Sequence, residues 1–335
     1  MYGMLVIMTS PLVPRVLGPL VALSLVLAGA PSATAAPVDV APSARPPSDS
    51  TVRQSAAHGP AEQADVLAYW SRERMDAAVP LGRVVDGVVA GLPLLPLGPA
   101  ARSRAAAPRS NSTGERWTHG GQVARTTGKV YLTIDGRDFT CSASVVRAKN
   151  RDTVFTAGHC LKDGTGSWAR NWTFVPAYAD GHQPYGRFTA RELLVPSKWA
   201  KKADESFDFG AAVLNSAGGA HVQDRTGAQR VAFGRRPQQS YAFGYPSTPP
   251  YRGDHLHYCS GDTRADRGGT TANGMRCVMT QGSSGGPWLA DFDPATGIGT
   301  LVSVISFKYV TDPSTQYGPR LGAEARRLYR RARTL

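Results

Sequence analysis

From Trp117 onward the sequence is a series of short apolar runs separated by glycine, aspartate and asparagine. Each run has the length of a β-strand and is shorter than an ordinary helix, so many short strands joined by turns are the simplest interpretation. The 36 glycines and 25 prolines among 335 residues favour this turn-rich architecture over a long helical bundle. We therefore predict an all-β barrel or sandwich, with strands at residues 130–134, 143–146, 153–156, 210–214, 231–233, 241–243 and 301–307.

The C-terminal end of the chain departs from this strand pattern. Residues 321–333 have a helical pattern, and the predicted helix carries five arginines, namely Arg326, Arg327, Arg330, Arg331 and Arg333. Cations near the end of a helix suit its dipole, and they contribute to the formal net charge of +13. We interpret these residues as a solvated basic face, with attraction to anionic polymers as the alternative. No nucleic-acid partner is expected.

Residues 1–35 have the features of a secretory signal peptide. Val16 to Ala30 is an almost wholly apolar run, and Ala33-Thr34-Ala35 is the small-x-small pattern that a signal peptidase recognises. A transmembrane anchor is the alternative, but the uninterrupted apolar stretch is shorter than the ~20 residues that span a bilayer. We expect a secreted, extracellular protein with no membrane span after signal cleavage.

Residues 36–115 have the composition of a pro-region. Residues 36–60 are rich in alanine, proline and serine, which predicts disorder. Residues 61–78 place apolar side chains at helical spacing and end before Pro80, which predicts one amphipathic helix. We expect this helix to dock on the β domain, where it assists folding or blocks a cleft; an inert spacer is the alternative. The β domain would then be residues 116–335.

Two motifs carry the residue types of nucleophilic catalysis. The first is Thr156-Ala157-Gly158-His159-Cys160, and the second is Gly282-Ser283-Ser284-Gly285-Gly286-Pro287. A serine hydroxyl is a poor nucleophile unless an adjacent base takes its proton, and imidazole titrates in the right range to do so. Glycines around the serine allow a sharp turn whose N–H groups face a developing oxyanion.

A catalytic histidine of this kind also needs a buried carboxylate to orient it. Eight aspartates lie between the two motifs, namely Asp163, Asp180, Asp204, Asp208, Asp224, Asp254, Asp262 and Asp266. A buried carboxylate should begin an apolar strand, and only Asp208 does so, in Asp208-Phe209-Gly210-Ala211-Ala212-Val213-Leu214. Asp204 and Glu205 are interpreted as a surface loop, because they follow two lysines.

The order of these residues along the chain tests other folds. Gly282-x-Ser284-x-Gly286 also fits the nucleophile elbow of α/β-hydrolases, in which the histidine follows the serine. No histidine follows His257, so that arrangement cannot be completed. The subtilisin order would require an α/β domain, which the short strands disfavour.

With its two motifs in this order, the sequence resembles the chymotrypsin-like (trypsin-fold) serine peptidases. It looks most similar to their secreted bacterial branch, which includes glutamyl-endopeptidase-like enzymes, over about residues 128–329. The resemblance implies two six-stranded antiparallel β-barrels and a C-terminal helix. It also implies a triad of His159, Asp208 and Ser284, with Ser284 rather than Ser283 as nucleophile. The N–H groups of Gly282 and Ser284 would then form the oxyanion hole.

Four cysteines allow three disulfide pairings. The resemblance implies a bridge across the histidine, between Cys141 and Cys160, which leaves Cys259 to pair with Cys277. His255, His257 and Cys259 alternate along the chain and could share one face of a strand, but Cys259 is better used in the bridge. We therefore expect no metal site and no cofactor.

Three positions depart from individual branches of the family. Ser283 replaces the aspartate that pairs with the new N-terminus in trypsin, so removal of a pro-segment is the expected route to activity. Val278 replaces the aspartate that selects basic side chains. Ser306 matches the serine that contacts the substrate backbone, but Ile305 replaces the histidine that precedes it in glutamyl-specific members.

The resemblance implies a secreted serine endopeptidase that is made as a preproenzyme and acts as a monomer on protein or peptide substrates. The alternative is a catalytically silent relative that binds a partner through its basic surface. Retention of all three triad residues favours the enzyme.

Overall fold

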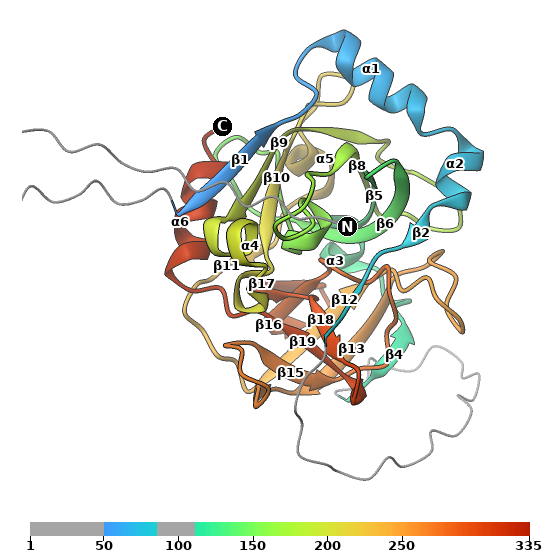
Figure 1. Cartoon of the computed structure of the whole chain (residues 1–335). Coiled ribbons are helices and arrows are strands. Elements are labelled where there is room, and N and C mark those ends of the chain that lie inside the picture. The colour runs from blue at the N-terminus through green and yellow to red at the C-terminus, as the bar shows by residue number, and fades with distance from the viewer. Residues whose placement is uncertain (1–49, 86–110) are drawn as a thin grey trace, which may run out of the picture. The chain divides into compact units, whose positions relative to one another are not determined.

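The computed structural model describes residues 50–85 and 111–335 (Figure 1). The predicted signal peptide, residues 36–49 and residues 86–110 lie outside the described residues. Everything below concerns the unit that spans Pro47–Leu335.

The first half of the β domain is a closed, six-stranded antiparallel barrel. Its strands follow the order β9-β10-β7-β6-β5-β8, and pairing of β8 with β9 closes the ring. The strands are β5 (Thr127–Ile134), β6 (Arg137–Val145), β7 (Thr153–Thr156), β8 (Arg170–Pro176), β9 (Phe188–Pro196) and β10 (Gly210–Leu214). The hairpin between β5 and β6 turns at Asp135-Gly136, both with positive φ, the pair that a two-residue hairpin turn prefers.

The second half of the β domain contains two sheets. A six-stranded sheet has the order β11-β17-β16-β12-β13-β4, and a five-stranded sheet has the order β14-β15-β19-β18-β3. Their strands in the β domain are β4 (Thr113–Arg116), β11 (Arg230–Val231), β12 (Gln239–Gly244), β13 (His257–Asp262), β14 (Arg264–Ala265), β15 (Asn273–Arg276), β16 (Pro287–Asp293), β17 (Ile298–Val304), β18 (Phe307–Tyr309) and β19 (Asp312–Gly318). The predicted all-β class is confirmed.

The helices of the β domain are short, apart from the last. They are α3 (Gly121–Thr126), α4 (Ser197–Lys202), α5 (Val222–Thr226) and α6 (Ala323–Ala332), with 3₁₀ turns η1 (Gly158–Cys160) and η2 (Glu205–Phe207). The predicted C-terminal helix is confirmed as α6. It buries Ala325, Leu328 and Ala332, while Arg326 and Arg327 on its other side are exposed. Within residues 50–85 and 111–335, no helix combines the length and apolar character needed to cross a membrane.

Residues 50–85 are more ordered than their composition predicts. They form β1 (Thr51–Ser55), α1 (Pro60–Tyr69), α2 (Arg72–Ala77), β2 (Val79–Pro80) and β3 (Arg83–Val85). Strand β1 pairs antiparallel with β9, at the edge of the first barrel. The edge of β9 supplies hydrogen-bond partners to a polar segment that has no strand signal of its own, so the expectation of disorder is wrong for Thr51–Ser55.

The single helix predicted over 61–78 is divided into α1 and α2. Trp70 ends α1, is only 2% exposed, and donates its Nε1–H to the carbonyl of Asn171 at 2.6 Å. Ser71 then begins α2, where its hydroxyl accepts a hydrogen bond from the Arg74 amide. Burial of the indole against the barrel and the new serine cap explain the break.

Candidate active site

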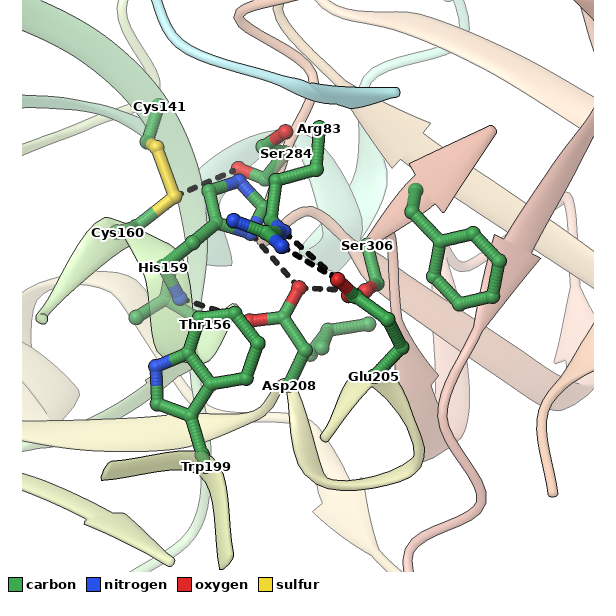
Figure 2. Close-up of polar contacts among 12 residues, drawn as sticks. Arg83, Cys141, Thr156, His159, Cys160, Trp199, Glu205, Asp208, Ser284 and Ser306 are labelled. Atoms are coloured by element: carbon green, nitrogen blue, oxygen red, sulfur yellow. Dashed lines mark hydrogen bonds and ion pairs between the residues drawn. A yellow bond between two sulfur atoms is a disulfide. The ribbon is translucent and has the colours of Figure 1, made fainter. Parts of the chain in front are cut away.

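The structure brings His159 and Asp208 into direct contact (Figure 2). His159 lies in η1, directly after β7, and Asp208 directly precedes the β10 segment. Strands β7 and β10 are antiparallel neighbours with Gly210 opposite Thr156, so their ends place the two side chains together. His159 Nδ1 lies 2.7 Å from Asp208 Oδ2, and both side chains are buried.

Asp208 accepts three hydrogen bonds that hold its carboxylate in place. Its Oδ1 accepts from the His159 amide at 2.7 Å, and its Oδ2 accepts from His159 Nδ1 and, at 2.5 Å, from the Ser306 hydroxyl. Burial alone would raise the pKa of Asp208. The charge of His159 and the hydrogen bonds from His159 and Ser306 outweigh burial, so the pKa of Asp208 lies below its usual value. The carboxylate is therefore ionised at neutral pH.

This contact determines which ring nitrogen of His159 is available as a base. An ionised carboxylate can only accept a hydrogen bond, so Nδ1 must carry the proton and Nε2 presents its lone pair. Nε2 is buried and has no hydrogen-bond partner among the described residues. The imidazole is thus held in the tautomer that can take a proton.

Ser284 lies in a loop that is fastened to the first barrel. The Ser142 amide donates to the Ser284 carbonyl at 2.7 Å, and the Ser142 hydroxyl donates to the Gly282 carbonyl at 2.9 Å. Cys160, the residue after His159, places its Sγ 3.7 Å from the Ser284 carbonyl oxygen. Ser284 therefore lies beside the His159 turn, as Figure 2 shows.

Glycine is required at three positions of this loop. Gly282 and Gly285 have φ angles of 92° and 82°, in the region that disfavours other residues. A Cβ atom at Gly286 would lie 1.8 Å from the Phe243 carbonyl oxygen. The glycine pattern of the motif thus reflects both the turn and its close approach to β12.

The backbone N–H of Gly282, predicted to face an oxyanion, already has an acceptor. It donates to the carbonyl oxygen of Leu81 at 2.8 Å. The sequence contains no signal for Leu81, because its contact with Gly282 spans 201 residues.

A cavity of about 860 Å³ adjoins Ser284. It is also lined by Ser306 and Val278, the two residues predicted to contact the substrate beyond the triad and the oxyanion donors. Arg264, Arg276 and Lys308 lie on its walls. Burial lowers the pKa of Lys308 to about 8, and its Nζ donates to the carbonyls of Cys277 and Pro313 at 2.7 and 2.6 Å. The cavity therefore adjoins the serine and has a cationic wall.

Both predicted disulfides are present, Cys141–Cys160 and Cys259–Cys277. Their partners are separated by 19 and 18 residues, loops for which the chain-entropy model gives roughly 3 kcal/mol of stabilisation each. Cys141, His159 and Cys160 lie close enough to suggest a metal cluster. The two sulfurs are bonded to each other, however, so they provide no thiolate ligands.

The sequence predicts a surface loop for Glu205, but the structure places this residue beside the site. Only 14% of its side chain is exposed, and it pairs with Arg83 next to Asp208 (Figure 2). Asp204 begins η2, where its carboxylate accepts from the Ser206 amide at 3.0 Å. The two lysines before this turn misled the prediction, because the chain folds inward only after them.

Comparisons with known proteins show what this chain is similar to. Residues 118–318 match the family model described as Trypsin. The protease Anisep from Arthrobacter nicotinovorans is 37% identical with a TM-score of 0.60, and the match covers 63% of this chain and 96% of that one. The thermostable serine protease AL20 from an extremophilic microorganism is 39% identical, also with a TM-score of 0.60, over 64% and 99% of the two chains.

Two further similarities are more limited. A Glu endopeptidase of 16% identity shares the fold, with a TM-score of 0.54 over 67% of this chain and 98% of that one. The extracellular metalloprotease of Bacillus subtilis (strain 168) is 33% identical over 70 residues, which are 21% of this chain. The chain matches only 22% of the length of that curated relative.

Proposed function

Because the chain belongs to the trypsin family of serine endopeptidases, we propose that it hydrolyses peptide bonds through a triad of His159, Asp208 and Ser284. The observation that carries this proposal is the buried His159–Asp208 pair, held beside the glycine loop of Ser284. The substrates would be proteins or peptides, and the active form a monomer.

In this mechanism Ser284 Oγ attacks the substrate carbonyl carbon while His159 Nε2 takes the hydroxyl proton. The carbonyl oxygen becomes an oxyanion, to which the N–H groups of Gly282 and Ser284 would donate. The C–N bond then breaks, and the leaving amine takes the proton from Nε2. Water attacks the resulting acyl-enzyme with His159 again as base, which releases the acid and restores the Ser284 hydroxyl.

Labelling with a fluorophosphonate probe tests whether the protein is a working enzyme. We expect stoichiometric covalent labelling of the mature protein at Ser284, because only an activated serine attacks the phosphorus. Peptide mapping by mass spectrometry identifies the labelled residue, and heat-unfolded protein is the control. A folded mature protein that is not labelled would favour the alternative, a catalytically silent relative that binds a partner through its basic surface.

Secretion is part of the proposal. The two disulfides support it, since such bridges persist in oxidising compartments outside the cytosol. The apolar run and the Ala33-Thr34-Ala35 pattern support cleavage of a signal peptide after residue 35.

We further propose that the protein is a preproenzyme whose pro-region ends before Ser112. Ser112 is buried and exchanges hydrogen bonds with Ser260 and Tyr258, and β4 pairs with β13. These contacts support a boundary earlier than residue 116, because they join residues 112–116 to the β domain. Arg116 lies within β4, which makes it a poorer cutting site than Arg109, a residue outside the described ranges.

N-terminal sequencing of the secreted, active protein tests this boundary. We expect the mature chain to start between residues 86 and 112, because a cut there leaves β4 intact. The residues before the cut would then be held only by noncovalent contacts. An active protein that starts at residue 36 or 37 would contradict the proposal.

A further inference from the structure

Residues 79–85 run through the proposed active site as an extended segment. Strand β2 pairs parallel with β6, and the Leu81 amide continues this pairing by donating to the Thr140 carbonyl at 2.9 Å. Leu81 then presents its carbonyl oxygen to the Gly282 amide. Strand β3 pairs parallel with β18, with Arg83 opposite Phe307. The segment therefore contacts both halves of the β domain and the donor proposed for the oxyanion.

The Leu81–Gly82 bond is not presented for cleavage, although its carbonyl faces Gly282. The leaving nitrogen would belong to Gly82, and His159 Nε2 would have to protonate it. Nε2 has no hydrogen-bond partner among the described residues, so the Gly82 nitrogen does not lie against it. Gly82 instead packs on Gln281, where a Cβ atom would lie 2.5 Å from Gln281 Cγ. The segment thus occupies the donor without offering a productive bond.

Arg83 holds this segment next to the triad (Figure 2). Its Nε and Nη2 donate to Glu205 Oε1 at 3.0 and 2.5 Å, and its guanidinium lies 5.1 Å from the Trp199 ring centroid. Trp199 is fully buried, and its Nε1–H donates to the Lys162 carbonyl at 2.8 Å. The indole face is therefore a rigid wall over which a planar cation stacks.

Arg83 balances the charge of Glu205, a largely buried carboxylate. Burial and the negative charge of Asp208 raise the pKa of Glu205, and Arg83 opposes that rise. The second carboxylate oxygen, Oε2, is buried and has no hydrogen-bond partner in the described chain. A buried carboxylate without a counter-ion is costly, so loss of Arg83 would leave a site that attracts another positive group.

We propose that Glu205 and Trp199 form a subsite for a cationic side chain, and that Arg83 fills it in the precursor so that residues 79–85 inhibit the enzyme. This proposal rests on the proposed peptidase function and adds its regulation. It assigns inhibition to the segment 79–85 rather than to the helices before it. In the mature enzyme the same subsite accepts an arginine or lysine side chain of the substrate.

The test uses purified mature enzyme and a synthetic peptide of residues 50–85, which contains the helices and strands that dock. Isothermal titration calorimetry measures binding without relying on catalysis, and hydrolysis of a peptide substrate measures inhibition. We expect binding and competitive inhibition, and no cut between Leu81 and Gly82. The Arg83→Ala peptide should bind at least about 10-fold more weakly, because a charge-assisted hydrogen bond is lost.

Variants of the peptide and of the enzyme test whether the binding depends on the pair of Arg83 and Glu205. The Arg72→Ala peptide should bind within about threefold of the unchanged peptide, since Arg72 is 73% exposed, its salt bridge is to Asp76 of its own helix, and it meets Gly181 of the β domain without a charged partner there among the described residues. Against enzyme with Glu205→Gln, the unchanged and Arg83→Ala peptides should differ by less than about threefold, because the charged partner is gone. Equal binding of these two peptides to unchanged enzyme would overturn the proposal, as would cleavage after Leu81.

A substrate library completes the test by placing arginine or alanine at each of three positions on the acyl side of the bond. At one position, kcat/KM should be at least about 10-fold higher with arginine than with alanine. In the Glu205→Gln enzyme, the ratio of these two kcat/KM values should fall toward one. Equal rates with both residues at every position would overturn the subsite. If the purified mature protein bound the peptide through Arg83 but hydrolysed no peptide substrate, the proposed function would be contradicted. The subsite for a cationic side chain would still be supported.

Discussion

Replacing Ser284 by alanine is expected to lower kcat of the mature enzyme on the order of 10⁶-fold without unfolding it. The substitution removes the proposed nucleophile but leaves the loop intact, because the loop is held through the Ser284 carbonyl and its glycines. Hydrolysis of a chromogenic peptide measures the rate, and thermal unfolding followed by circular dichroism checks the fold.

Ser283 provides a matched control in the same loop. Its hydroxyl donates to the Thr280 carbonyl at 2.6 Å, so it is directed away from a catalytic function. Ser283→Ala should lower kcat by less than about 10-fold, since only one hydrogen bond is lost. If Ser283→Ala abolished activity and Ser284→Ala did not, the choice of nucleophile would be wrong.

Replacing Asp208 by asparagine is expected to lower kcat about 10⁴-fold. The amide group of asparagine can donate, so it can turn the ring proton of His159 from Nδ1 to Nε2. Nε2 would then be unable to take the proton of Ser284. Because the pKa of Asp208 is lowered, the unchanged enzyme keeps this carboxylate charged at neutral pH, and it loses that charge only as pH falls below the usual range of aspartate.

Asp204 lies four residues earlier and serves as the control for this substitution. Its carboxylate caps η2 by accepting from the Ser206 amide, and asparagine caps helical turns equally well. Asp204→Asn should therefore change kcat by less than about threefold, measured with the same peptide substrate. Near-normal activity of Asp208→Asn would exclude Asp208 as the carboxylate that orients the histidine.

Much of the site could be predicted because its residues adjoin the ends of buried strands. The apolar run before His159 becomes β7, and the run after Asp208 becomes β10. Local patterns specify both strands, and a polar residue at the end of a buried strand needs a partner. The glycines of the Ser284 loop likewise predict a tight turn, since few other residues are tolerated at positive φ angles and at close backbone contacts.

Local sequence patterns thus predicted the all-β class and the Asp208 strand, and the family resemblance added the two disulfide pairs and the candidate triad. The positions of residues 50–85 depend on contacts that are distant in the sequence. Their strands β1, β2 and β3 are short and have no apolar alternation, so the sequence does not predict them. They form because β9, β6 and β18 provide hydrogen-bond partners for them. The pairing of Arg83 with Glu205 spans 122 residues, and no local pattern encodes such a contact. The pair forms because the fold brings the largely buried Glu205 beside the segment that carries Arg83.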